Sequence, residues 1–77
     1  MDVSSLVRFV AQSLVDKPDA IDVQQIDGPD CVVIELHVDP DDMGKVIGKQ
    51  GRIAKSIRSV VKAATVKNEK PVRVDIV

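Results

Sequence analysis

The sequence predicts a small α+β domain in which helices cover one face of a three-stranded sheet. Three observations support this fold class. Apolar residues follow helical or strand spacing in the order helix, strand, strand, helix, helix, strand. Each expected strand is apolar on one face and each expected helix has one apolar stripe, so a single buried layer separates them. With 77 residues, the chain has room for a single domain spanning residues 1–77.

The first element is expected to be an amphipathic helix over residues 3–15. Its apolar residues form one helical stripe: Val3, Leu6, Val7, Val10, Ala11, Leu14 and Val15. Asp2 can accept a hydrogen bond from a free N–H group at the start of this helix. Pro18 cannot continue the helix, which therefore ends before that residue.

Two strands are expected next, joined by a turn at residues 27–30. Residues 20–26 predict a short strand with Ile21 and Val23 on one face, although Gln24 and Gln25 interrupt the alternation. Residues 31–38 have the clearest strand pattern. One face carries Val32, Ile34, Leu36 and Val38, and the other carries Cys31, Val33, Glu35 and His37.

The second half of the chain predicts a short helix, a longer helix and a last strand. Asp39 followed by Pro40 is typical of a helix start, and Gly48 ends this helix early. The longer helix is expected over residues 52–66. Its inward stripe is expected to be Ile53, Ile57, Val60, Val61 and Ala64. The last strand follows Pro71, with Val72, Val74 and Ile76 on one face.

Charge is distributed unevenly along the chain. The net charge of −1 argues against a general polyanion binder. However, residues 1–40 contain two basic and eight acidic residues, whereas residues 41–77 contain nine basic and four acidic residues. Between residues 43 and 73, Glu69 is the only acidic residue. A basic region of this kind attracts a polyanion, although a solvated helix face is the simpler interpretation of basic residues alone.

Several classes of function are disfavoured by composition. Phe9 is the only aromatic residue, so RNP-type sheets and OB grooves, which stack bases on aromatic rings, do not fit. One cysteine and one histidine provide neither a disulfide nor the usual metal sites, and no metal or other cofactor is expected. Cys31 and His37 are about 20 Å apart on an extended strand, too far for a nucleophile and its base. We therefore expect that the protein is not an enzyme.

Two further expectations concern the acidic residues at the start of the second helix and the cellular location of the protein. Asp39, Asp41 and Asp42 could suggest a metal site, but helix capping explains these carboxylates without one. No signal peptide and no apolar run of membrane-spanning length is visible. A cytoplasmic protein with a reduced thiol is therefore expected.

The most informative segment is Gly48-Lys49-Gln50-Gly51, which lies between two expected helices. Gly48 allows the first helix to end in a left-handed conformation, and Gly51 allows another backbone to approach closely. Free N–H groups and the positive end of the following helix favour a phosphate at this position. Lys49 and Gln50 can add a charge and a hydrogen bond. The surrounding basic residues are Lys45, Arg52 and Lys55.

Other interpretations of these glycines are weaker. A lone GxxG is common between helices and is not specific. The spacing of Gly44 and Gly48 resembles a small-residue motif of membrane helices, but Lys45 and Lys49 exclude that environment. Residues 44–49 also resemble a Walker loop. The segment is one residue short, lacks the following Ser or Thr and does not follow a strand, so nucleotide hydrolysis is rejected.

The context of the loop resembles a KH domain. The full pattern is Val46-Ile47-Gly-x-x-Gly-x-Ile53-x-x-Ile57, within a strand–helix–GxxG–helix–strand unit. The helix and strand before this unit resemble the type II arrangement, α-β-β-α-α-β, which implies a mixed sheet with three helices on one face. From Val3 to Val77 the chain is similar to the small stand-alone bacterial KH proteins of the KhpA (YlqC) family.

This resemblance implies that the loop clamps about four nucleotides of single-stranded RNA. It places the groove between the GxxG side and the edge of the 31–38 strand, with an apolar floor. Bases would be read by backbone groups, which limits selectivity and is typical of an RNA chaperone or a post-transcriptional regulator. The residues expected to bind RNA are Gly48, Lys49, Gln50, Gly51, Lys45, Arg52 and Lys55, with Val46, Ile47 and Ile53 as the floor.

The resemblance also implies pairing, either as a homodimer or with a larger KhpB-like KH protein. A single clamp binds weakly, so useful affinity favours two clamps acting together. Val33, Ala54 and Val61 are the candidate contacts for such a dimer. The alternative function is a protein–protein interaction module that keeps the KH scaffold but binds little RNA. Lys49 and Gln50 at the loop tip argue against that alternative.

Overall fold

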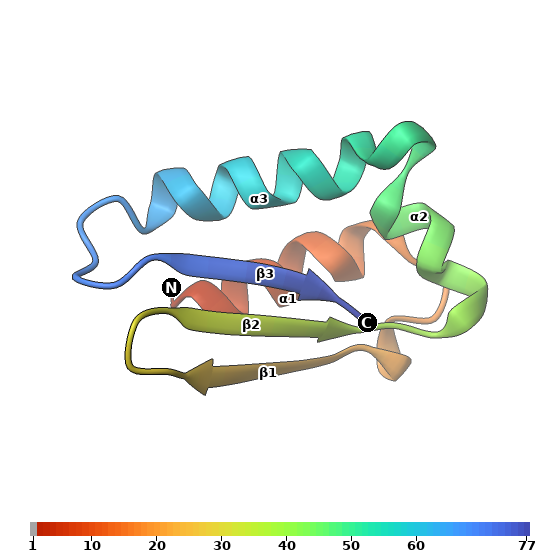
Figure 1. Ribbon diagram of the computed structural model, residues 1–77. Helices are drawn as coiled ribbons and strands as arrows, with labels where there is room; N and C mark the ends of the chain where they lie inside the picture. The colour runs from red at the N-terminus through yellow and green to blue at the C-terminus, as the bar shows by residue number, and fades with distance from the viewer. Residues whose placement is uncertain (1) are drawn as a thin grey trace.

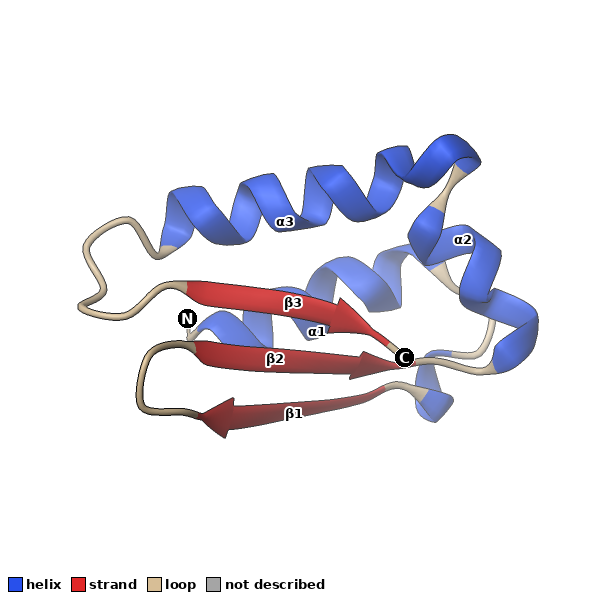
Figure 2. Ribbon diagram, in the orientation of Figure 1, coloured by secondary structure: helices blue, strands red, loops and turns tan. Residues whose placement is uncertain are grey.

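The helices lie on one side of a three-stranded sheet in the computed structural model, which describes residues 2–77 (Figures 1 and 2). In chain order, the elements are α1 (Val3–Leu14), β1 (Asp22–Asp27), β2 (Val32–His37), α2 (Met43–Ile47), α3 (Arg52–Ala64) and β3 (Val72–Ile76). Short 3-10 turns occupy Pro18–Ala20, Pro40–Asp42 and Lys49–Gly51. The expected order of helices and strands is confirmed.

Strand β2 is the central strand of a mixed sheet with the order β1-β2-β3. It pairs with β1 in antiparallel register, from Asp22 opposite His37 to Asp27 opposite Val32. It pairs with β3 in parallel register, from Val32 beside Val72 to Leu36 beside Ile76. A parallel pair requires a long crossover connection, and α2 and α3 provide it. Strands β1 and β3 therefore form the two edges of the sheet.

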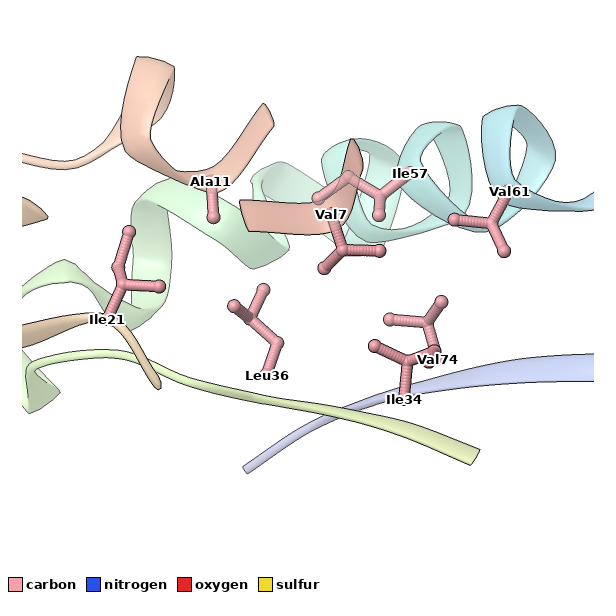
Figure 3. Packing of buried hydrophobic residues seen from close by; sticks show 8 residues of the cluster. All are labelled: Val7, Ala11, Ile21, Ile34, Leu36, Ile57, Val61 and Val74. Carbon is pink, nitrogen blue, oxygen red and sulfur yellow. The ribbon is translucent and has the colours of Figure 1, made fainter. Parts of the chain in front are cut away.

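The core lies between the sheet and the helices (Figure 3). Helix α1 contributes Val7 and Ala11, while α3 contributes Ile57 and Val61. The remaining fully packed members come from the strands and the segment before β1: Ile21, Ile34, Leu36 and Val74. These side chains follow helical spacing on α1 and α3 and alternate along β2, as expected for a domain with a single buried layer.

The buried face of α3 differs from the predicted stripe. Val60 is 47% exposed and Ala64 is also exposed, whereas Ala54 and Thr65 are buried. The buried face of α3 is therefore shifted around the helix axis relative to the predicted stripe, and Thr65, which directly follows the helix, continues this buried face. Thr65 tolerates burial because its hydroxyl donates a hydrogen bond to the Val61 carbonyl at 2.8 Å. Ala54 and Val61 are both buried, with 4% and 1% exposure, so two of the three candidate dimer contacts were wrong.

The start of α1 has the predicted cap. The Ser5 N–H donates a hydrogen bond of 2.7 Å to Asp2 Oδ1, and this bond lowers the pKa of Asp2 below its usual 3.8. The helix ends at Leu14, before the turn at Pro18–Ala20 that delays the start of β1 to Asp22. Within residues 2–77, no helix combines the length and the apolar character required to cross a membrane.

Candidate functional site

The segment between α2 and α3 is a tight, exposed turn. Gln50 and Gly51 both have left-handed backbone angles, with φ of 59° and 74°. The Arg52 N–H donates a hydrogen bond to the Lys49 carbonyl across them, which is the pattern of a type I′ turn. Lys49 and Gln50 are both exposed. Because left-handed angles are costly for a residue other than glycine, Gln50 is held here against its own preference.

The two glycines serve different purposes. Gly48 has φ 76° and ψ 174°, an extended region that only glycine adopts readily, rather than the left-handed helical conformation predicted. A Cβ atom on Gly48 would lie 2.6 Å from Cγ1 of Ile53, so the turn packs directly on that side chain. Around Gly51 there is open space, with no heavy atom within 4 Å of a Cβ position. That space leaves room for another molecule to approach Gly51.

Only part of the loop backbone is free to bind a ligand. The Gly48 N–H donates to the Gly44 carbonyl at 2.9 Å, and the Gly51 N–H donates to the Gly48 carbonyl at 3.1 Å. Among residues 2–77, no acceptor is found for the N–H groups of Lys49 and Gln50. The Gly48 and Gly51 amides are therefore used within the loop, and the two adjacent amides at the tip remain for a ligand.

The basic residues around the turn fall into two groups. Lys49, Arg52 and Lys55 are exposed and form no ion pair with any residue in 2–77. Lys45, in contrast, pairs with Asp16 and, at 3.5 Å, with Asp42. The hydrogen bond to Asp16 raises the pKa of Lys45 above its usual 10.5. Lys45 thus has a structural use, and only the first group is free to meet an anion.

The expected apolar floor is partly inside the core. Val46 is completely buried, so its side chain cannot contact a ligand. Ile53 is half-buried beneath Gly48. Ile47, with 36% exposure, is the most accessible of the three. The floor therefore consists of Ile47 and the exposed part of Ile53.

The start of α2 is anchored by Asp42, whose importance the sequence did not reveal. This side chain is 2% exposed and accepts hydrogen bonds from the N–H groups of Asp16 at 3.3 Å and Lys17 at 3.0 Å. Burial raises the pKa of Asp42, but these bonds and Lys45 outweigh burial and hold it below the usual 3.8. We call this group, Asp42 with Asp16, Lys17 and Lys45, the Asp42 anchor. It joins the end of α1 to the start of α2.

The other acidic residues near α2 support the same junction. Asp39 accepts a hydrogen bond from the Asp41 N–H at 2.9 Å, as expected for a cap. Asp41 lies 3.0 Å from Nζ of Lys17. Capping and ion pairing therefore account for these carboxylates.

The predicted groove along the 31–38 strand was wrong, because β2 is central and both of its edges are already paired. The free edge on the α3 side belongs to β3. Between α3 and β3 lies a pocket of about 460 Å³. Its basic lining residues are Arg58, Lys62, Lys70 and Arg73. The sequence placed these four in a basic region, but only the strand order brings them around one pocket.

The sequence model of the KH domain of KhpA and KhpB matches residues 4–76. The chain is 55% identical to the RNA-binding protein KhpA of Clostridium perfringens, over 97% of this chain and 100% of that protein. It is equally similar, with the same coverage, to the RNA-binding protein KhpA of Caldanaerobacter subterraneus. The RNA-binding protein KhpA of Halalkalibacterium halodurans is 53% identical, over 97% of this chain and 99% of that protein.

A solved structure also has a similar fold. Era, in complex with MgGDPNP and a segment of 16S ribosomal RNA, superposes with a TM-score of 0.64 at 24% sequence identity. The superposition covers 96% of this chain and 28% of the Era chain. At this level of identity the likeness concerns the fold alone.

Proposed function

Because the chain belongs to the KhpA/KhpB family of KH-domain proteins, a family of RNA-binding proteins and not of enzymes, we propose that it binds single-stranded RNA through the turn at Lys49 and Gln50. The type II KH arrangement expected from the sequence agrees with the element order and the mixed sheet. The observation that carries the proposal is a pair of N–H groups that find no acceptor among residues 2–77, on an exposed turn beside cations that form no ion pair with those residues.

A phosphate group is the natural acceptor for these donors. One phosphate oxygen accepts hydrogen bonds from the Lys49 and Gln50 N–H groups, and the Lys49 ammonium neutralises its charge. Arg52 and Lys55 lie in the first turn of α3, where the positive end of the helix also favours an anion. A phosphodiester strand thus meets backbone donors first and mobile cations around them.

The bases of the bound strand turn toward Ile47 and Ile53 and then along α3. These aliphatic side chains offer a surface without the hydrogen-bonding groups that distinguish one base from another. Recognition by backbone groups and aliphatic contacts has low sequence specificity. Such a binder fits an RNA chaperone or a post-transcriptional regulator, and the alternative is a KH scaffold that binds proteins but little RNA.

The expected affinity is modest and depends on salt. If three or four phosphates are neutralised, the slope of log K against log salt is about −2 to −3, at roughly −0.7 per phosphate. Two clamps in one dimer raise the effective affinity without any new type of contact. We propose a homodimer or a pair with a larger KhpB-like KH protein. Of the predicted contacts, Val33 is half-buried and remains available, and Phe9 and Val60 are exposed apolar residues.

The test of the clamp is the double variant Lys49→Asp with Gln50→Asp. We expect the fold to survive, because both residues are exposed and aspartate tolerates the left-handed backbone at position 50. RNA affinity, measured by fluorescence anisotropy with a single-stranded oligonucleotide, is expected to fall at least tenfold. The change replaces attraction at the tip with repulsion of every phosphate.

A matched control is Arg8→Asp with Gln12→Asp on α1. It changes the net charge by the same amount on two exposed residues far from the turn in the sequence. We expect a loss of no more than about twofold, because neither residue belongs to the turn and the interactions of exposed charges are weakened by salt. Equal losses in the two double variants would show that net charge, and not the turn, determines binding. Unchanged binding in the Lys49 and Gln50 variant would favour the protein-binding alternative.

A simpler measurement separates the two functions at purification. The chain contains no Trp or Tyr and absorbs little at 280 nm. Bound nucleic acid therefore dominates the ratio of absorbance at 260 and 280 nm, and nuclease treatment removes it. A ratio unaffected by nuclease would support the protein-binding alternative.

A further inference from the structure

Arg58 connects α3 to the free edge of the sheet. Its Nε–H donates a hydrogen bond of 3.2 Å to the carbonyl of Val74 in β3. An edge strand normally presents such a carbonyl as an unpaired acceptor. Here the acceptor already receives a hydrogen bond from a side chain of the neighbouring helix, so it is less available to a base.

The same bond leaves the rest of the guanidinium free. An arginine has five N–H donors in a rigid planar fork and no acceptor. Among residues 2–77, the terminal nitrogens of Arg58 form no hydrogen bond and no ion pair. At this point of the sheet edge, an approaching base therefore meets the N–H donors of a positioned guanidinium group rather than a backbone acceptor alone.

This fork lines the pocket between α3 and β3. The pocket, of about 460 Å³, lies within the size range of small-ligand sites. Val66, Pro71 and Val72 provide an apolar lining. Two of the basic side chains are already engaged, because Lys70 donates to the Gly28 carbonyl and Arg73 pairs with Asp75. Arg58 and Lys62 remain the cations available to a bound molecule.

We propose that this pocket takes one unstacked base of the RNA strand and that Arg58 makes it select guanine over adenine. This inference rests on the proposed function, since the strand is first held at the turn. Guanine presents two neighbouring acceptors, O6 and N7, which match two donors of the fork. Adenine presents an amino group beside N7, so a donor meets a donor.

The position of the pocket agrees with a single strand that reaches both sites. Six residues of helix separate Arg52 from Arg58, a rise of about 9 Å. At about 3.4 Å per nucleotide, this corresponds to about three nucleotides of stacked strand. The cations favour a polyanion, and the apolar lining can pack against the face of a base.

The test compares uridine hexamers that carry one guanosine or one adenosine at each position in turn. Dissociation constants are measured by anisotropy for the wild-type protein, Arg58→Met and Arg58→Lys. For the wild type, we expect guanosine to bind about fivefold to tenfold more tightly than adenosine at one position, near the lower end of the range for a two-donor contact. Arg58→Met abolishes this ratio. Arg58→Lys restores part of the affinity, but it does not restore the preference.

Two controls separate base recognition from charge and from folding. Lys62→Met removes a cation from the same pocket without a bond to the strand edge, and it should weaken guanosine and adenosine hexamers equally. Inosine, which keeps O6 and N7, should bind like guanosine, and 7-deazaguanosine should not. Thermal unfolding of each variant verifies that the fold persists.

Equal binding of the purine hexamers to the wild type would overturn the inference, as would a preference that persists in Arg58→Met. If the hexamers bind through Lys49 and Gln50 without purine preference, the inference fails and the proposed function stands. If no hexamer binds the wild type, both fail.

Discussion

The polar groups at the two ends of α2 differ in whether they have hydrogen-bond partners within the described chain. At its start, the Asp42 carboxylate is buried and accepts hydrogen bonds from two backbone amides and Lys45. At its end, the Lys49 and Gln50 N–H groups have no acceptor within residues 2–77. A helix of five residues is too short to persist alone in water. This contrast indicates that the hydrogen bonds at the start of α2 hold the helix in place, so the N–H donors at its end can remain available to a ligand.

The largest effect on stability is expected from Gly48→Ala, which disrupts the turn at the end of α2 directly. The new Cβ would clash with Ile53 and would force alanine into a backbone region reserved for glycine. We expect a loss of about 3 kcal/mol in the free energy of unfolding, measured by urea titration.

Gly44→Ala is the matched control for that substitution. A Cβ on Gly44 would meet no atom within 4 Å, and the residue lies inside α2. The substitution should be neutral or stabilise by up to about 1 kcal/mol, because alanine favours a helix. Similar losses for both variants would mean that the backbone angles at Gly48 are not required.

The next largest effect is expected from Asp42→Asn, which weakens the Asp42 anchor at the start of α2. The amide keeps the shape but loses the charge that faces Lys45, so the melting temperature should fall by several degrees. RNA affinity should fall as well, because the turn is no longer held. Asp19→Asn, at an exposed carboxylate without a hydrogen bond in the described chain, should leave both unchanged. A stable Asp42→Asn variant with weakened RNA binding would separate positioning from stability.

The dependence on pH sharpens the same comparison. The pKa of Asp42 in the folded protein lies below its usual 3.8. Its contribution to stability is therefore fully present above pH 3.8 and is lost as the pH falls through the lower, folded-state pKa. Melting curves between pH 2 and pH 7 should show the wild type and Asp42→Asn converging in acid. A constant difference across this range would contradict the assignment.

The smallest effect is expected from Gln50→Gly, in the turn at the end of α2. Glycine adopts the left-handed angles of this position without strain, so stability should rise by about 0.5–1 kcal/mol. RNA affinity should change by less than about twofold if the backbone N–H groups carry the contact. Gln50→Val should instead destabilise, because a β-branched side chain disfavours a positive φ. A Gly variant less stable than the wild type would show that the Gln50 side chain has a structural role.

The regular elements were predictable because each depends on local spacing. The stripe of α1, the Asp2 cap and the alternation in β2 depend on residues close together in the chain, and all are confirmed. The inward face of α3 was less predictable. Both Val60 and Thr65 flank the true stripe, and only contact with β3 determines which flank is buried.

The position of the turn was predictable, but which of its amides and nearby lysines remain without a partner was not. The two glycines located it, whereas the bonds within the loop decide which amides remain available. Lys45 could not be distinguished from Lys49 by charge alone, since its partner Asp16 lies 29 positions away in the sequence, although Asp42 is only three positions before it. The location of the pocket depends on which strand forms the sheet edge beside α3, and no local sequence pattern encodes the order of the strands. Arg58 matters for the same reason, because Val74 is sixteen positions away in the sequence.

The parallel pairing of β2 and β3 has a consequence for the newly synthesised protein. The helices form from nearby residues, whereas β3 must return across the whole crossover to reach β2, which makes this step slow. In the order of synthesis, β3 is the last of these elements, so the turn at Lys49 and Gln50 is complete in the chain before the strand that forms one wall of the α3–β3 pocket. Until β3 docks beside β2, the pocket lacks that wall, whereas the turn between α2 and α3 is already complete.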